Sequence, residues 1–303
     1  MGGYRQLSLN IDYVNIQTQG NAQEFGDLLS TTVGTGNYGA GGCANKIRGL
    51  IGGGNGPGGK CPYIQYITTA SKGNAINFGN LSVSRFMTSG LSSSTRGLFG
   101  GGRTPSDLNT IDYVEIMTLG NALDFGDLIQ AANKHPGSVS SPTRGIFGAG
   151  YGGGGQIDAV TIASKGNSTD FGEDLFRGGY THGGGSTGVR GMWAGGYAVP
   201  SGSPYPINRH TRSIRGVIIA SDGNAVEFGE LKRATGLTYT AGLSDKTRAC
   251  WGGGYVLSPS VNVNTIEYFQ MNSSGNAMDF GDLTVKVALH SSLSDCHGGL
   301  GGY

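Results

Sequence analysis

The stretch from Arg96 to Leu128, RGLFGGGRTPSDLNTIDYVEIMTLGNALDFGDL, contains the pattern that decides the fold. It opens with Arg-Gly-apolar-apolar-Gly-Gly-Gly, continues with an alternating run from Ile111 to Ile116, and ends with Gly-Asn-Ala-Leu-Asp-Phe-Gly-Asp-Leu from Gly120. Alternation of apolar and polar residues, with β-branched and aromatic types dominating, is typical of a half-buried strand. The stretch therefore predicts short β-strands separated by glycine-rich turns.

The closing motif of this stretch recurs along the whole chain. With small variations, it occurs six times, at Gly20–Leu28, Gly73–Leu81, Gly120–Leu128, Gly166–Leu175, Gly223–Leu231 and Gly275–Leu283. A strand-like run of the Ile-Asp-Tyr type precedes each copy. Repetition at a period of roughly fifty residues is typical of repeat architectures such as propellers.

The arginine-glycine motif alternates with the first motif. It starts at Arg48, Arg96, Arg144, Arg190 and Arg248, and a degenerate copy, His297-Gly-Gly-Leu-Gly-Gly-Tyr303, ends the chain. Segments rich in small residues, such as Phe86–Ser93, lie between the two motifs. Each unit therefore predicts four strands: a small-residue strand near a crowded centre, the Gly-Gly strand, the Ile-Asp-Tyr strand and the Phe-Gly strand. Four short strands per unit are the spacing of one propeller blade.

The repeated residues are predicted to be structural. The Gly-Asn pair before the fourth strand is a hairpin signal that tolerates positive φ. The phenylalanine of the fourth strand is expected to wedge against the next blade, at Phe25, Phe78, Phe125, Phe171, Phe228 and Phe280.

The units resemble the kelch family. Kelch blades carry a Gly-Gly pair at the end of the second strand and an aromatic residue in the third, matched here by pairs such as Gly100-Gly101 and by Tyr66, Tyr113 and Tyr268. The chain departs from the family by carrying Phe where kelch blades have Trp. The resemblance implies an all-β, six-bladed kelch-like β-propeller with four antiparallel strands per blade.

The ends of the chain predict how the ring closes. The sequence begins with a third strand and ends with a first strand and Gly301-Gly302-Tyr303. We therefore expect residues 1–303 to form a single propeller domain, closed by one shared blade formed by about residues 1–30 and 284–303. Such closure leaves no free sheet edge. The alternative is an open solenoid or a head-to-tail polymer.

Binding residues are expected in the connections that vary between units. Loops from second to third strands lie on one face, and function concentrates in variable loops on a rigid scaffold. Aromatic and arginine side chains are enriched at binding hot spots. The longest loop, from Tyr197 to Arg212, and its counterparts in other units supply the candidates Tyr197, Tyr205, Arg209, His210, Arg212, Arg103, Tyr151 and Tyr255. An ordinary solvated insertion is the alternative for the long loop.

Composition argues against several classes of function. The net charge of +1 shows no basic excess for nucleic acid, and no apolar stretch approaches a membrane span. The five histidines are dispersed and Cys43, Cys61, Cys250 and Cys296 have no metal-ligand spacing, so we expect no metal, cofactor or catalytic set. Calcium held by the recurring carboxylates, as at Asp27, Asp127 and Asp282, is a weaker alternative.

These observations predict a non-catalytic structural or binding protein. The amino-acid sequence of the repeats is similar to that of kelch-like repeats in structural proteins of tailed phages. That resemblance implies a virion component, such as a head decoration, a tail fibre tip or an adhesin, with other virion proteins or a host-surface glycan or protein as partners. A cellular kelch-type interaction module or a sugar-binding propeller is the alternative.

Overall fold

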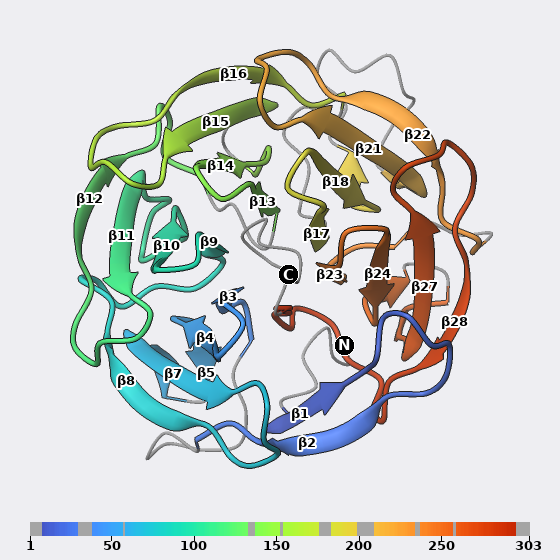
Figure 1. The fold of residues 1–303 in the computed structure, drawn as a ribbon, viewed down its shortest axis with the longest axis horizontal. Coiled ribbons are helices and arrows are strands. Elements are labelled where there is room, and N and C mark those ends of the chain that lie inside the picture. Colours follow the sequence, from blue (N-terminus) through green and yellow to red (C-terminus); the bar gives the residue numbers. More distant parts are fainter. Residues whose placement is uncertain are drawn as a thin grey trace.

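The computed structural model of the protein describes residues 8–29, 38–56, 58–132, 137–151, 154–175, 183–198, 209–233, 237–256 and 259–294. Every regular element in these ranges is a β-strand. Twenty of the strands form five four-stranded antiparallel sheets, the blades, which surround a central axis (Figure 1). The chain is therefore a β-propeller.

The strands of each blade run from the axis to the rim in chain order, as the two motifs predict. Blade 1 contains β3 (Gly41–Ala44), β4 (Arg48–Gly52), β7 (Tyr63–Thr68) and β8 (Ile76–Asn80). Blade 2 contains β9 (Ser89–Ser92), β10 (Arg96–Gly100), β11 (Thr110–Glu115) and β12 (Leu123–Asp127). Blade 3 contains β13 (Ser138–Ser140), β14 (Arg144–Phe147), β15 (Gln156–Thr161) and β16 (Thr169–Glu173). Blade 4 contains β17 (Gly183–Ser186), β18 (Arg190–Ala194), β21 (Ser213–Ile218) and β22 (Val226–Glu230). Blade 5 contains β23 (Ala241–Ser244), β24 (Arg248–Gly252), β27 (Thr265–Gln270) and β28 (Met278–Asp282).

The prediction of six four-stranded blades is wrong, because the described residues form five. Between blade 5 and blade 1 the ring holds a two-stranded antiparallel sheet, the closing sheet, made of β1 (Asn10–Tyr13) and β2 (Gln23–Asp27) (Figure 1). The expected partners were two C-terminal strands. Residues 284–294 form no strand, and residues 295–303 lie outside the described residues.

The sequence offers a physical reason for this departure. Counting from Ser294 against Ser244, the last copy of the second motif has Gly298 at the place of Arg248 and Gly301 at the place of Trp251. It therefore lacks the arginine and the large apolar side chain that anchor β24. Glycine also loses more conformational entropy than other residues when a strand forms. A second strand of this composition would lack the contacts that Arg248 and Trp251 of blade 5 make.

Six equivalent junctions nevertheless join neighbouring units at the rim. In each junction a backbone amide of the fourth strand donates to the side-chain oxygen of the asparagine in the next unit's Gly-Asn turn, over 3.0–3.1 Å. The donors are Asp27, Asn80, Asp127, Glu173, Glu230 and Asp282, and the respective acceptors are Asn74, Asn121, Asn167, Asn224, Asn276 and Asn21. The last pair connects blade 5 to the closing sheet, so the rim is continuous.

The glycine of this turn meets the glycine of the neighbouring fourth strand. A Cβ added to Gly79 would lie 2.1 Å from the carbonyl oxygen of Gly120, and Gly120 has a φ of +152°. A side chain at Gly79 has no room, and one at Gly120 would be strained. The repeated Gly-Asn and Phe-Gly pairs are therefore two halves of one contact between units.

A second contact at each junction uses the polar residue of the third strand. Asp112 accepts a hydrogen bond from the backbone amide of Ser82, just beyond β8, over 2.9 Å. Gln65, Asp158, Glu267 and Asp12 accept equivalent bonds from Leu29, Ile129, Lys232 and Thr284. In blade 4 the third-strand residue is instead the donor: Arg215 donates to the carboxylate of Asp174, just beyond β16, over 2.8 Å.

The arginine that opens each second strand also links two units. Its guanidinium lies 4.6–5.4 Å from the centre of an aromatic ring of its own blade, and it donates to a backbone carbonyl of the next unit. Arg96 stacks on Tyr113 and donates to the carbonyls of Ile162 and Ala163. Arg248 reaches the carbonyls of Ile16 and Gln17 in the connection between β1 and β2.

Apolar side chains fill the spaces between units. The cluster around Phe78, for example, joins Leu50 and Ile64 of blade 1 to Val114 and Ile116 of blade 2. Phe125, Phe171, Phe228 and Phe280 belong to corresponding clusters. Phe25 instead borders a cavity at the remaining junction. The core is thus a ring of separate clusters.

Candidate functional site

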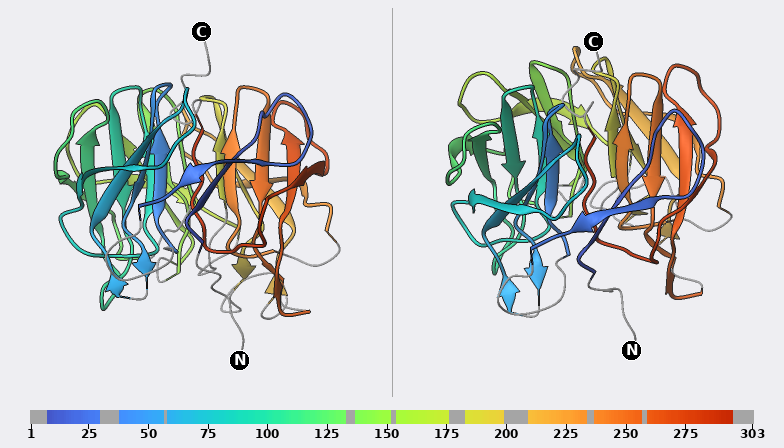
Figure 2. Two further views of the ribbon diagram at one scale, coloured as in Figure 1. Left: turned by 90° about the horizontal axis from the view of Figure 1, so that it is seen from below. Right: turned by 60° about the horizontal axis from the view of Figure 1, so that its bottom comes forward.

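The two faces of the propeller differ in structure. The connections from second to third strands lie on one face, which we call the variable loop face. Three of them form hairpins, β5 (Asn55–Gly56) with β6 (Gly59–Lys60), β19 (Tyr197–Ala198) with β20 (Arg209–His210), and β25 (Tyr255–Val256) with β26 (Val261–Asn262). Figure 2 shows these hairpins projecting together from the lower face of the ring. The opposite turn face carries the short, repeated turns.

The candidate binding residues of the variable loop face fall into different environments. Tyr151 and Arg103 are exposed, while Arg212 is half-buried and forms an ion pair with Glu230. Tyr255 is only 4% exposed, and its backbone pairs with that of Thr238, so its ring is part of the packed interior.

The long loop is described at its two ends. Tyr197 pairs with His210 and Ala198 with Arg209 in the hairpin β19–β20. Tyr205 lies outside the described residues. The loop therefore starts from a defined β-hairpin on the variable loop face.

Arg103 is held by its own loop. Its Nε donates to the carbonyl oxygen of Pro105 over 3.3 Å, and it lies 3.9 Å from the carboxylate of Asp107. Because the side chain is 45% exposed, the ion pair contributes little to stability. The contacts instead fix the direction of a cationic group at the surface.

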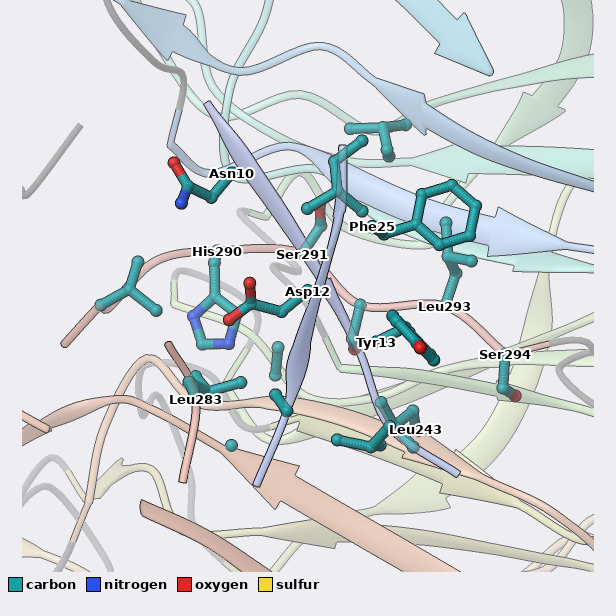
Figure 3. Close-up of a pocket in the computed structure, with 18 of the residues that line it drawn as sticks. Asn10, Asp12, Tyr13, Phe25, Leu243, Leu283, His290, Ser291, Leu293 and Ser294 are labelled. Atoms are coloured by element: carbon teal, nitrogen blue, oxygen red, sulfur yellow. The ribbon is translucent and has the colours of Figure 1, made fainter. Parts of the chain in front are cut away.

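A second candidate site is a cavity of about 510 Å³ beside the closing sheet, which the sequence analysis did not predict. Figure 3 shows side chains from β1, from β2 and from the segment Leu289–Ser294 around one space. Most of the lining is apolar and includes Ile11, Phe25, Leu243, Leu283 and Leu293. The volume falls within the range of about 300–1,000 Å³ that ligand sites occupy.

The cavity lies where β1 has no inner neighbour among the described strands. In each blade the third strand pairs with both a second and a fourth strand, but among the described residues β1 pairs only with β2. Tyr13 is accordingly 37% exposed, while its counterpart Tyr113 is 8% exposed. Ile11 and Asp12 are half-buried, whereas Ile111 and Asp112 are fully buried.

His290 is the histidine among the described residues that line the cavity. Burial lowers the pKa of His290 to about 4, so the imidazole is neutral near pH 7. Its Nδ1 is buried without a hydrogen-bond partner in the described structure. Sequence reasoning noted His290 only as one of five dispersed histidines, because nothing near it in the chain marks it.

The described residues contain no group of three His, Cys, Asp or Glu side chains placed to hold a metal ion. Cys43, Cys61 and Cys250 are free thiols, and Cys296 lies outside the described ranges. Burial raises the pKa of Cys43, and it raises that of Cys250 to about 12. Both thiols are therefore protonated and buried, which makes them poor nucleophiles.

Within the described ranges no helix is long and apolar enough to cross a membrane. Comparison of the sequence with protein-family models and with curated proteins finds no match. The fold itself is that of a binding scaffold, because a β-propeller presents loops of varied sequence from a rigid ring.

Proposed function

We propose that the chain is a non-catalytic structural and binding protein whose variable loop face contacts a macromolecular partner. The observation that carries the proposal is the contrast between the two faces. One presents nearly uniform turns whose glycines and asparagines are used between units. The other carries three hairpins and the longest connection, which differ in length and sequence from one unit to the next.

The chemistry of the variable loop face suits a polar or glycan-bearing surface. Arg103 and Tyr151 are exposed there, and Arg212 presents a guanidinium paired with Glu230. Arginine and tyrosine combine hydrogen bonding with stacking at binding hot spots. Residues 199–208, between β19 and β20, add Tyr205 and three prolines to the same connection.

We further propose that the protein is a virion component of a tailed phage, such as a head decoration, a tail fibre tip or an adhesin. This assignment rests on the resemblance of the repeats to kelch-like repeats of phage structural proteins. The near-neutral charge is compatible with it.

The first test is electron cryo-microscopy of the native particle that contains the protein. We expect propellers in fixed stoichiometry on a capsid or tail, with the variable loop face directed toward a partner or outward. A propeller found only as a free monomer would count against the virion assignment and favour a cellular interaction module.

The second test is an array of glycans and peptides probed with the purified chain. We expect a hit whose affinity falls at least about tenfold in the double variant Arg103→Ala/Tyr151→Ala, because hot-spot side chains dominate binding energy. The matched control is Met117→Ala/Leu119→Ala, which removes two exposed side chains of the turn face. Equal loss in both double variants would place binding elsewhere.

A further inference from the structure

The cavity beside the closing sheet lies where a complete blade has its second strand. On its axial side, the segment Leu289–Ser294 follows the course of a first strand. Leu289 has a φ of +62°, close to +58° at Met87 and +60° at Tyr239, which lie two residues before β9 and β23. Its amide donates to the carbonyl of Tyr239 and its carbonyl accepts from Gly39, as the equivalent residues of neighbouring units do.

On the rim side, β1 occupies the place of a third strand. It pairs with β2 in the register of β11 with β12, including the bulge after Ile11 that corresponds to the one after Ile111. The position between β1 and Ser291–Ser294 therefore corresponds to the place of a second strand in the complete blades, and we call it the slot.

The slot lacks an arginine that every complete blade supplies. The ring of Tyr113 has two cations near it, Arg96 at 5.2 Å and Lys165 at 4.9 Å. The ring of Tyr13 has the counterpart of the lysine, Lys72 at 4.6 Å, and no described arginine. Thr69, at the place of Ile162, lines the cavity, and no arginine among the described residues donates to its carbonyl.

The axial wall also carries a polar group that a second strand would meet. Thr88, at the position of His290, donates its hydroxyl to the carbonyl of Gly100 at the end of β10, over 3.1 Å. The Nδ1 of His290 lies buried without a partner in the same place. An extended backbone in the slot would bring a hydrogen-bonding group to it.

The segment that follows Ser294 does not supply this chemistry. Residues 295–303, Asp-Cys-His-Gly-Gly-Leu-Gly-Gly-Tyr, contain no arginine or lysine. Glycine stands at the arginine place and at one of the two apolar places of a second strand. The aromatic face of Tyr13 and the apolar walls at Leu243 and Leu283 thus suit a strand that carries an arginine and two large apolar residues, which residues 295–303 do not have.

We propose that the slot binds an extended segment of another polypeptide, of the type Arg-Gly-apolar-apolar-Gly, which adds as a strand to the inner edge of β1. Its arginine stacks on Tyr13 and donates to the carbonyl of Thr69. Its apolar residues fill the cavity between Leu243, Phe25 and Leu293. Strand addition of this kind takes its affinity from main-chain hydrogen bonds and its specificity from side-chain pockets. The site is separate from the variable loop face and does not depend on it.

The test uses the full chain and the peptide Ser-Thr-Arg-Gly-Leu-Phe-Gly-Gly, the sequence of residues 94–101, in isothermal titration calorimetry. We expect saturable binding with one peptide per chain. Replacing the peptide arginine by alanine should weaken binding about tenfold, because stacking and hydrogen bonds to the guanidinium are lost. Hydrogen exchange should show new protection at the amides of β1 when the peptide is bound.

Protein variants locate the site. Tyr13→Leu should weaken peptide binding about tenfold, whereas Tyr63→Leu, which changes a tyrosine of similar exposure in β7, should leave it unchanged. The double variant Arg103→Ala/Tyr151→Ala should also leave it unchanged, which separates this proposal from the function of the variable loop face.

Three results would overturn the proposal. The first is absence of binding, and the second is binding that is indifferent to both the peptide arginine and Tyr13. The third concerns a further variant, Leu300→Asp: it is peptide binding by this variant together with no peptide binding by the unaltered chain. That result would mean that the residues after Ser294 already fill the slot.

Discussion

Single polar residues hold this propeller together where its units meet. Asp112 is fully buried and accepts hydrogen bonds from the amide and hydroxyl of Ser82, and it pairs with Arg85 over 3.0 Å. Both partners of the ion pair are 0% exposed. Removing one partner of such a pair leaves an uncompensated buried charge, and the free-energy cost of that charge determines the loss of stability.

Asp112→Ala is therefore expected to lower the free energy of unfolding by about 3–5 kcal/mol, because Arg85 stays buried without its carboxylate. Denaturant unfolding measures the loss. Asp124→Ala, an exposed carboxylate opposite Asp112 in β12, should change stability by less than about 0.5 kcal/mol. A similar loss in both variants would mean that the buried pair has no special role.

His290 makes stability depend on pH. Burial lowers its pKa from an ordinary value of 6.5 to about 4, so the unfolded chain binds a proton more readily than the folded chain between these two values. The contribution of His290 to stability is therefore complete above about pH 6.5 and decreases as the pH falls toward 4.

We expect His290→Gln to lose less stability than the unaltered chain when the pH falls from 7 to 5, since glutamine does not titrate. Thermal unfolding of both proteins at the two pH values measures the difference. Parallel pH dependence in the two proteins would show that His290 is not protonated on unfolding in this range.

The second strands contribute at the scale of the element, because each one links its own blade to the next. In β10, Arg96 stacks on Tyr113, bonds to Glu115 and donates to two carbonyls of blade 3. These interactions join the first residue of the strand both to its own blade and to the next blade. The repeated arginine is thus part of the junction rather than a surface charge.

Arg96→Gln is expected to lower the free energy of unfolding by about 1–3 kcal/mol, because the stacking and the charged hydrogen bonds are lost together. Arg103→Gln, on the variable loop face, is the matched control and should change it by less than about 0.5 kcal/mol. Equal values for the two arginines, measured by denaturant titration, would contradict the junction role.

At the scale of the whole molecule, the ring closes through its rim. The side chain of Asn21 accepts from the amide of Asp282, and that of Asp12 accepts from the amide of Thr284. These bonds join residues about as far apart in the chain as any others in the structure. These two bonds hold the closing sheet against blade 5. Because proteins open locally in separate units, their loss should first increase local opening of the ring at this junction.

The double variant Asn21→Ala/Asp12→Ala should increase hydrogen exchange in β1, β2 and blade 5 while blades 2 and 3 keep their protection. The control Asn167→Ala/Asp158→Ala removes the same two side chains between blades 2 and 3. It should increase exchange there and leave the closing sheet unchanged. Uniform acceleration across all blades in the first variant would indicate that the ring opens only as one unit.

Much of the fold follows from the repeat. The order of the four strands, the chain order of the blades and the continuous rim follow from motifs such as Gly120–Leu128, because the glycines and the asparagine of the motif make the same contact at each junction. Binding sites follow less well. Tyr255 belongs to an aromatic class typical of hot spots, yet it is buried, and residue type alone does not separate an exposed ring from a packed one.

The sequence by itself determined the four-stranded blade and the repeated contact between units, since the alternating strands and the paired glycines recur in every copy of the motifs. Only the tertiary structure decided how the ring closes. The copy at the end of the chain keeps the glycines but lacks the arginine and the second large apolar residue, and whether a strand then forms depends on a sum of contacts that no motif displays. The cavity beside the closing sheet arises because residues far apart in the chain surround a place that the described strands leave unfilled.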